Sequence, residues 1–364
     1  TSDGVYIDGS RTVEGDMTGP VSAQMVLRDP AVSVAILETA RGGLLRRGLG
    51  FRSPNVSCCI NVSADHLGMQ GIETLEDLAK IKQIPIEVAT DTVVLNADDI
   101  HCLQMASKSK AEQICYVTTN PNNQLVKMHI RAGGQAVVLE DGINGQMITL
   151  YDKGTHIPLV WTHLIPATVE GMAMHNVQNA MFASAMAYAM DASLENIRQG
   201  LRTFDSSFFQ TPGRMNFFEK NGYKIILDYG HNPAAVEAMC DFVDRLADDQ
   251  STKGDSRKVC VLSAPGDRRD EDIVSIAHRA SLTFEKFIIR EDDRLRGRER
   301  GDVAKILEDT LFKYGIHPEN IHVIHSEVDA IEHALNECRS GDIILVFADN
   351  VTRSWKQIIY YHHE

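Results

Sequence analysis

Apolar runs of strand length alternate with stretches of helical spacing along most of this sequence, and this alternation constrains the fold more than any other feature. From Ala31 to about Thr119 the runs are VSVAILET (32–39), VSCCINVS (56–63), LEDLAKIKQIPIEVA (75–89), TVVLNADD (92–99) and QICYVT (113–118). Only the third run has helical spacing. Such a pattern is typical of a mostly parallel sheet flanked by helices, so we expect an α/β fold.

The pattern changes between Gln124 and Pro166, where polar and apolar residues alternate and the dipeptides GG, DG and NG interrupt them. These dipeptides favour hairpin turns, and we expect an antiparallel insert. Two helices are predicted next, over 174–193 and 193–204. The polar segment 205–214, DSSFFQTPGR, is the best candidate for a hinge between two domains.

A second alternation begins after this hinge. Strands are predicted at 224–230, 258–266, 286–292, 321–324 and 342–349, with helices at 233–247, 270–282, 300–315 and 329–338 between them. This order is typical of a Rossmann-like, doubly wound α/β domain, whose ligands lie outside the carboxyl ends of the strands. The segments at these ends are DYGHNP, APGDRRDED, REDDRLRGR and FADNVTRSW, and their charges predict a binding face.

The composition narrows the class of protein. With 364 residues, 43% of them apolar and 24% charged, the chain has room for two cores. A net charge of −14 argues against a nucleic-acid partner and is compatible with a cationic substrate, although many acidic proteins have none. Neither a signal peptide nor a membrane span is recognisable, so we expect a cytoplasmic protein. The seven cysteines are interpreted as reduced core residues.

Two predicted strands deliver polar residues at their ends. Glu38 is followed by a predicted glycine-rich turn that contains Gly42 and Gly43. A carboxylate beside such a turn can hold a hard cation against phosphate oxygens. A helix N-cap or a surface acid explains Glu38 equally well. Asp65 and His66 follow the next strand, where a neutral imidazole could complete a magnesium or manganese site. Histidine is not a usual ligand of hard cations, and a hydrogen-bonded loop histidine is the alternative.

Four helical residues are weaker candidates. Lys80 and Lys82 lie on the helix predicted at 75–89, where a lysine pointing inward could be carbamylated to give an oxygen ligand; a solvated lysine is the ordinary alternative. Asn176 and Asn179 are three residues apart and so share a helix face. They could contact a purine edge, or they could simply be polar residues at the start of a helix.

A fifth group of candidates lies at the start of the second alternating region. Arg214 falls on one arm of a predicted hairpin, and Asp228 and His231 follow the next strand. A guanidinium suits phosphate, and a carboxylate suits ribose hydroxyls. None of the five groups is decisive by itself.

The segments ETARGG, NVSADHLG, LNADD, HNVQNA, PGR and DYGHNP, in this order, resemble the Mur ligase superfamily. The resemblance implies a Mur ligase central domain over 1–210, followed by a Rossmann-like C-terminal domain over 211–364. It also implies an ATP-dependent amide ligase that activates a carboxylate as an acyl phosphate, with ATP and Mg²⁺ as cofactors.

Further segments resemble one branch of this superfamily. They are TSDGVYIDG, TGPVSAQMVLRDP, ETARGGLLRRGLGF, PGDRRDEDI, LRGRERGD and DNVTRSWKQII, and they are spread over nearly the whole chain. In that branch the Mur-like module joins L-arginine to the side-chain carboxylate of a poly-aspartate backbone. The implied partners are L-arginine and an aspartate-based polymer, with no nucleic acid and no membrane, and we expect a homo-oligomer.

The resemblance also implies roles for single residues. Glu38 and His66 match the family's magnesium ligands, and Lys82 best matches the lysine that is carbamylated in several members. His66, Lys82 and Arg41 are the predicted catalytic residues.

Nucleotide and substrate contacts follow in the same way. The residues matching the ATP-binding positions are Asn176, Asn179, Arg214, Asp228 and His231. Those expected to bind substrate are Thr39, Gly42, Arg268, Asp270, Asp292 and Arg296, the last four because they lie on charged strand-end loops.

Two departures from the family pattern are visible. The glycine-rich phosphate loop of the GTNGKT type is not among the 364 residues and is expected about two dozen residues before Thr1, so we expect the chain to be an excerpt that does not turn over ATP efficiently by itself. Position 230 is glycine where the family commonly has alanine, and we expect only added local freedom.

Two other functions are compatible with the fold. One is an inactive module used for oligomerisation or polymer binding, although the retained Glu38, Asp65, His66, Arg214 and Asp228 favour catalysis. The other is a ligase acting on a peptidoglycan precursor or folate, against which the segments ETARGG and GDRRDED count.

Overall fold

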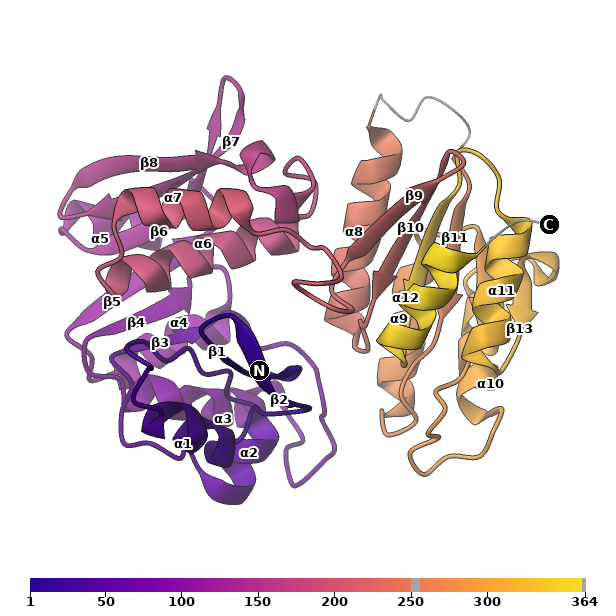
Figure 1. The fold of residues 1–364 in the computed structure, drawn as a ribbon, viewed down its shortest axis with the longest axis horizontal. Helices are drawn as coiled ribbons and strands as arrows, with labels where there is room; N and C mark the ends of the chain where they lie inside the picture. Colours follow the sequence, from indigo (N-terminus) through magenta and orange to yellow (C-terminus); the bar gives the residue numbers. More distant parts are fainter. Residues whose placement is uncertain (250–255, 362–364) are drawn as a thin grey trace. The chain divides into compact units, whose positions relative to one another are not determined.

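The computed structural model describes residues 1–249 and 256–361 (Figure 1). The chain forms two compact units, each containing several separate stretches of the sequence. The first comprises Thr1–Val62, Gln70–Val160 and Gln178–Arg198, and the second comprises Ser63–Met69, Trp161–Val177 and Gln199–Glu364. The units therefore interleave along the chain, and the domain boundary after residue 210 stays a prediction.

The first unit is built on a six-stranded sheet. Its strands, in spatial order, are β3 (Val56–Cys59), β4 (Thr92–Asn96), β5 (Gln113–Thr118), β6 (Gln135–Gly142), β7 (Gly145–Asp152) and β8 (Thr155–Trp161). Strands β3 to β6 are parallel, and β7 is antiparallel to β6. All five residues of β4 are buried, which explains its unbroken apolar run. The predicted antiparallel insert is thus a continuation of the main sheet, because β6 pairs with β5.

Helices and a hairpin complete this unit. The elements are β1 (Gly4–Ile7), β2 (Ser10–Glu14), α1 (Pro20–Arg28), α2 (Arg41–Arg47), α3 (Leu75–Glu87), α4 (Ile100–Met105), η1 (Ala106–Lys108) and α5 (Gln124–Arg131). Thr74 caps α3 by accepting from the Asp77 backbone N–H, and Asp99 caps α4 in the same manner. Four further elements follow β8, where the chain passes from one unit to the other and back. They are η2 (Thr162–Leu164), η3 (Pro166–Thr168), α6 (Met174–Ala189) and α7 (Leu194–Thr203).

The second unit is a doubly wound domain, as predicted (Figure 1). Its strands, in spatial order, are β13 (Ile321–Val323), β12 (Lys286–Ile289), β11 (Lys258–Leu262), β14 (Ile343–Phe347), β10 (Tyr223–Asp228) and β9 (Asn216–Lys220). Five strands are parallel, and β9 pairs with β10 as the predicted hairpin. The last strand in sequence, β14, lies between β10 and β11.

Two cores cover the faces of this sheet. One contains buried residues of α8 (Pro233–Asp248), α9 (Asp270–Ser281) and α10 (Asp302–Lys313), and the other contains those of α11 (Glu327–Glu337) and α12 (Val351–Tyr360). A short η5 (Pro318–Asn320) precedes β13. Because α8 and α12 follow neighbouring strands but lie on opposite faces, the loops after β10 and β14 diverge. A crevice at the carboxyl ends is the consequence.

Four local predictions were wrong. The glycine-rich turn predicted after Glu38 is the start of helix α2, and the predicted antiparallel insert begins with helix α5. The apolar run 32–39 is not a strand: it pairs with no described strand, and the side chain of Ile36 is 83% exposed. An extended segment is not stabilised as a strand without a hydrogen-bonding neighbour. The segment after β14 was expected to be a loop, but α12 begins at Val351, where Asn350 caps it by accepting from the Arg353 N–H. Within the described residues no helix is long and apolar enough to cross a bilayer.

Candidate active site

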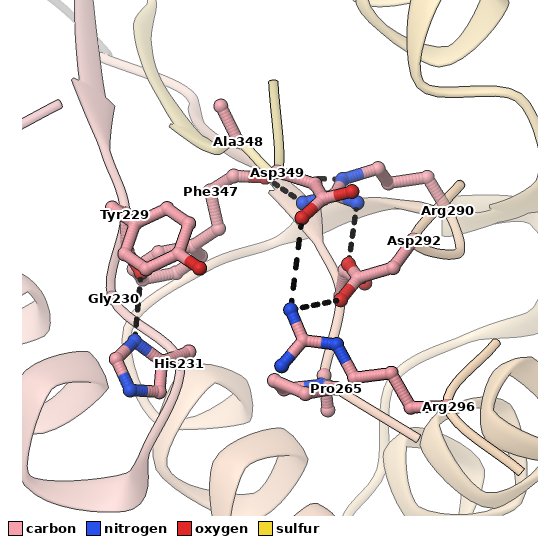
Figure 2. Close-up of a pocket in the computed structure, with 12 residues that line it drawn as sticks. Tyr229, Gly230, His231, Pro265, Arg290, Asp292, Arg296, Phe347, Ala348 and Asp349 are labelled. Atoms are coloured by element: carbon pink, nitrogen blue, oxygen red, sulfur yellow. Dashed lines mark hydrogen bonds and ion pairs between the residues drawn. The ribbon is translucent and has the colours of Figure 1, made fainter. Parts of the chain in front are cut away.

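The loops at the carboxyl ends of four parallel strands of the second unit surround a hollow (Figure 2). It opens to solvent, and the empty space in it, part of which is open solvent, is about 260 Å³. The residues that line it are Tyr229, Gly230, His231, Ser263, Ala264, Pro265, Arg290, Asp292, Arg296, Phe347, Ala348 and Asp349.

Arg290 is buried behind this hollow and joins two of its loops. Its Nε and Nη2 donate to the carbonyl oxygen of Phe347 at 3.1 and 2.7 Å, and its Nη1 donates to Oδ1 of Asp292 at 2.8 Å. A guanidinium presents five donors in one rigid plane, so a single arginine can fix several acceptors at once. Arg290 therefore positions Asp292 and the end of β14.

Glu327, at the start of α11, holds the loop after β14. Its Oε2 accepts from the Asp349 N–H at 2.6 Å, and its Oε1 accepts from Asn350 N–H at 3.1 Å and Ser354 Oγ at 2.7 Å. Burial would raise the pKa of this carboxyl, but Arg290 and these hydrogen bonds outweigh burial and lower the pKa. Glu327 is thus a buried carboxylate that places Asp349 at the hollow.

Arg296 is the second guanidinium of the hollow, and its pairs are looser. Its Nη2 lies 3.7 Å from Oδ2 of Asp292 and 3.8 Å from Oδ1 of Asp349, and its Nη1 lies 3.7 Å from Oδ1 of Asp267. Burial raises the pKa of Asp349, and the nearby Asp292 raises it further. A raised carboxyl pKa means that the anion is incompletely stabilised, so an additional cation in the hollow would stabilise Asp349.

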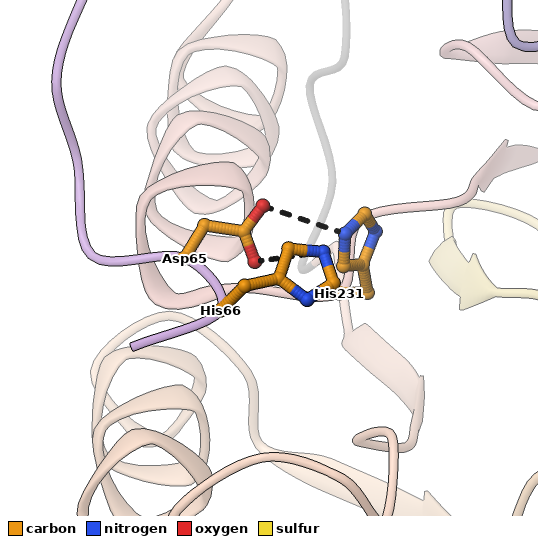
Figure 3. A group of neighbouring side chains, drawn as sticks. All are labelled: Asp65, His66 and His231. Carbon is orange, nitrogen blue, oxygen red and sulfur yellow. Dashed lines mark ion pairs between the residues drawn. The ribbon is translucent and has the colours of Figure 1, made fainter. Parts of the chain in front are cut away.

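Beside the hollow, the segment Ser63–Met69 brings a carboxylate and an imidazole to the same unit (Figure 3). Oδ1 of Asp65 lies 3.2 Å from Nη2 of Arg268 and 3.7 Å from Nε2 of His66, and Oδ2 lies 3.8 Å from Nε2 of His231. One carboxylate is therefore shared by three cationic or titratable groups.

The ring of His66 faces the guanidinium of Arg268. Nη1 lies 3.1 Å from Nδ1 of the ring and Nη2 lies 3.3 Å from Nε2. A neutral imidazole accepts at one nitrogen only, so one of these contacts is a hydrogen bond in either tautomer. Arg268 is 4% exposed and also donates to Asp267 at 3.0 Å, which makes it a buried, permanent cation beside His66.

His231 lies at the boundary between this cluster and the hollow. Its Nδ1 lies 3.2 Å from the carbonyl oxygen of Tyr229. Burial lowers the pKa of His231, Arg268 and Arg214 lower it further, and Asp65 opposes them. The net lowering of the pKa favours the neutral imidazole at pH 7.

Asp228 organises the loop after β10. Its Oδ2 accepts from the Met215 N–H at 2.8 Å, and its Oδ1 accepts from the Gly230 N–H at 2.6 Å. A Cβ on Gly230 would lie 2.8 Å from Cε1 of Phe347, so glycine here avoids a collision rather than only adding freedom, which corrects the prediction. The exposed Arg214 has its guanidinium carbon 5.6 Å from the ring centroid of Tyr229.

In the first unit, the predicted residues of the segment ETARGG lie just before α2 and in its first turn. Glu38 is exposed, and its Oε2 accepts from the Ser2 N–H at 2.9 Å. Thr39 is half-buried, and α2 begins with Arg41 and Gly42. The segment therefore presents a carboxylate directly before a helix N-terminus.

The two lysines of α3 differ in burial and in the partner of the ammonium group. Lys82 is half-buried, and its Nζ donates to the carbonyl oxygen of Asn61 at 2.9 Å, just beyond the end of β3. Lys80 is exposed and pairs with Asp77 at 3.1 Å. Lys82 is thus the one of the two that points toward the end of β3, while Lys80 matches the solvated alternative.

Asn176 and Asn179 both lie on α6. Nδ2 of Asn176 donates to the carbonyl oxygen of Ala167 at 2.7 Å, so part of its bonding capacity supports η3. Asn176 belongs to the second unit and Asn179 to the first. Their role in contacting a base stays a prediction.

Several predicted residues meet in the second unit. His66, His231 and Arg268 share Asp65, and Asp292 and Arg296 line one hollow. Asp270 is not among the lining residues, and its exposed side chain pairs with Arg298 at 2.6 Å.

Three residues of the site were not predicted from the sequence: Arg290, Glu327 and Asp349. The first and last follow strand ends, a signal that could have identified them, whereas Glu327 begins a helix and carries no such signal.

Two family descriptions match this chain. "Mur ligase middle domain" matches residues 9–187, and "Mur ligase, glutamate ligase domain" matches residues 213–350. The chain belongs to the Mur ligase family.

The relatives within this family narrow the comparison. The chain is 39% identical to a cyanophycin synthetase of Crocosphaera subtropica over 97% of its residues, and 41% identical to that of Trichormus variabilis over 98%. It spans 39% and 38% of the lengths of these two relatives. A diaminopimelate-adding ligase of Chlamydia caviae, UDP-N-acetylmuramoyl-L-alanyl-D-glutamate--2,6-diaminopimelate ligase, is 24% identical over 93% of the chain and 63% of its own length.

Solved structures agree on the fold. A UDP-N-acetylmuramoyl-L-alanyl-D-glutamate--2,6-diaminopimelate ligase matches all of this chain and 72% of its own, with a TM-score of 0.55 at 19% identity. Folylpolyglutamate synthase of Mycobacterium tuberculosis, complexed with ADP, matches 88% of this chain and 67% of its own, with a TM-score of 0.58 at 17% identity. These similarities confirm the predicted Mur ligase architecture.

Proposed function

We propose that this chain is the Mur-like part of a cyanophycin synthetase, which uses ATP to join L-arginine to the side-chain carboxylate of a poly-aspartate backbone. The observation that carries the proposal is the 41% identity to a cyanophycin synthetase over 98% of the chain. The match covers 98% of the chain, and the charges of the strand-end loops around the hollow suit an amino-acid substrate.

The proposed reaction has two steps. The acceptor carboxylate takes the γ-phosphoryl group of ATP, which forms an acyl phosphate and releases ADP. The amine of L-arginine then attacks the carbonyl carbon, the C–O bond to phosphate breaks, and the nitrogen loses a proton as the isopeptide bond forms. Here the protein positions the reactants and stabilises charge.

The hollow of the second unit is the proposed site for L-arginine. Asp292 and Asp349 present carboxylates that a guanidinium or ammonium group can pair with, and the raised pKa of Asp349 favours such a cation. Arg296 offers a guanidinium to a carboxylate of the substrate. Asp270, which pairs with Arg298, and Arg268 are proposed to contact the polymer end.

ATP contacts are proposed for Asn176 and Asn179 at the base, and for Arg214, Asp228 and His231 around ribose and phosphate. Arg214 is exposed and so has a guanidinium available for phosphate oxygens. Thr39, Arg41 and Gly42 are proposed to lie where phosphate and substrate approach, with Lys82 nearby as a carbamylated residue. The 364 residues contain no GxxxxGK[ST] loop, so we propose that they do not turn over ATP efficiently by themselves.

The donor set fits Mg²⁺ in part. Glu38 supplies the oxygen donor that Mg²⁺ prefers, and Mg²⁺ bound there would neutralise phosphate charge. His66 fits less well, because an imidazole is not a usual ligand and both of its nitrogens face Arg268 within 3.3 Å. We therefore propose Glu38 as the main protein ligand and His66 as a weaker one.

The test is arginine-dependent ADP release by the full-length parent protein on a short aspartate–arginine primer. Glu38→Ala and His66→Ala should each lower turnover about 100-fold or more while folding stays intact. Glu76→Ala is a matched control, because Glu76 is an exposed glutamate in the first turn of α3. It should leave turnover unchanged.

The same assay separates the other two functions. A parent without arginine-dependent turnover, or two variants that keep it, would favour an inactive module for oligomerisation or polymer binding. Stimulation of ATP hydrolysis by a different amino acid would instead indicate another substrate on the same fold.

A further inference from the structure

Apart from the candidate active site, two histidines and a glutamate of the second unit meet where strand β13, at the edge of its sheet, contacts α11. His322 lies in β13, and His333 and Glu337 lie one helical turn apart in α11. One possible ligand atom from each residue lies within 4.8 Å of those from the other two. The ring centroids of the two histidines are 4.8 Å apart.

One nitrogen of each ring lacks a hydrogen bond. Nε2 of His322 and Nε2 of His333 are buried, and within the described residues neither makes a hydrogen bond. The nearest charged atom to Nε2 of His333 is Oε1 of Glu337, at 3.5 Å. Buried polar atoms are usually satisfied, so these two nitrogens are available to a ligand.

The protonation states suit a metal ion. Burial lowers the pKa of His322, and Lys286 and His333 lower it further, which favours the neutral ring that a metal requires. Burial would raise the pKa of Glu337, but Lys286 outweighs burial and lowers the pKa. Lys286 pairs with Oε2 of Glu337, and Oε1 lies 3.5 Å from Nε2 of His333. The charge of Lys286 also opposes a cation and limits its affinity.

We propose that His322, His333 and Glu337 bind a divalent transition-metal ion, with Zn²⁺ the best match. Two imidazoles and one carboxylate are a known type of zinc donor set, in which water takes the fourth position. Ligands of a tetrahedral zinc, with bonds of about 2.0–2.1 Å, lie about 3.3 Å from one another. The ligand atoms here lie within 4.8 Å of one another, so the side chains must close by up to about 1.5 Å. The bound ion would link β13 to α11.

The test uses the full chain without a histidine tag, stripped of metal by a chelator. Zinc chloride is titrated in by calorimetry at pH 7.5, and the thermal midpoint is measured with and without zinc. The wild-type protein should bind one zinc ion at this site and melt at a higher temperature when zinc is present. His333→Gln and Glu337→Gln should each weaken this binding about 100-fold and abolish the rise in thermal midpoint.

Two further variants sharpen the result. His317→Gln is the matched control, since His317 is an exposed histidine of the same unit outside the cluster, and it should bind zinc like the wild type. His66→Asn removes a member of the other histidine cluster. The proposal is wrong if His333→Gln and Glu337→Gln bind zinc with wild-type affinity, or if only His66→Asn loses zinc.

Discussion

Nη1 of Arg268 lies 3.1 Å from Nδ1 of His66, although 202 positions separate the two residues in the sequence. The same guanidinium lies 3.2 Å from Asp65 and 3.0 Å from Asp267. A buried arginine with two carboxylates and an imidazole joins the segment Ser63–Met69 to the loop after β11. The contribution of this contact to the free energy of unfolding can therefore be measured.

Arg268→Ala should lower the free energy of unfolding by about 3 kcal/mol, because it leaves Asp65 and Asp267 without their buried cation. Urea denaturation at pH 7 measures the change. Arg300→Ala, which truncates an exposed arginine of the same unit, should change stability by no more than about 0.5 kcal/mol. Equal effects of the two substitutions would contradict a structural role for Arg268.

Glu327→Gln should lower the free energy of unfolding by about 2–4 kcal/mol at pH 7, because a buried carboxylate with several donors loses its charge. The pKa of Glu327 is lowered from its ordinary value of 4.5. Its charge therefore contributes stability that is fully present above about pH 4.5 and is lost as the pH falls through the folded pKa. Urea denaturation between pH 7 and pH 3.5 should show the wild type and the variant converging at acid pH. A constant difference across that range would contradict the prediction.

Gly213→Ala should destabilise the protein by about 2–3 kcal/mol. The φ of Gly213 is +71°, and a Cβ would lie 2.6 Å from Cγ2 of Val351, so strain and a collision add together. Gly341→Ala isolates the strain, because Gly341 has a φ of +94° and open space around its Cβ position. It should cost about 1 kcal/mol. Thermal or urea unfolding of both variants should rank them in this order.

Under the proposed function, Lys82→Ala should lower arginine-dependent turnover of the full-length parent about 100-fold, because it removes the lysine proposed to be carbamylated. Lys80→Ala should have no effect, because Lys80 is exposed and pairs only with Asp77 among the contacts described. The comparison holds helix propensity constant, since both changes replace lysine by alanine in α3. A similar loss in both variants would assign the effect to the helix rather than to Lys82.

Much of the architecture could be predicted from local patterns. The five parallel strands of the second sheet were predicted, and β9 was expected only as one arm of a hairpin. The segments DYGHNP, REDDRLRGR and FADNVTRSW were placed at strand ends, because parallel strands bring their carboxyl ends to one edge. The failures have local causes as well. The run 32–39 is apolar enough for a strand but has no pairing partner, and α12 depends on a cap by Asn350 within a segment whose charges suggested a loop.

The sequence by itself determined the layers, the sheet edge at which the charged strand-end segments gather, and the family, because residue periodicity and motif order are local properties of the chain. Only the tertiary structure decided which charges meet. The insertion of β14 between β10 and β11 brings Asp349 beside Asp292 and Arg296, and the fold of Ser63–Met69 places Asp65 against Arg268. The lowered pKa of His231 and the paired histidines His322 and His333 likewise depend on burial and on neighbours remote in sequence. Such contacts follow from strand order and packing, which local patterns do not specify.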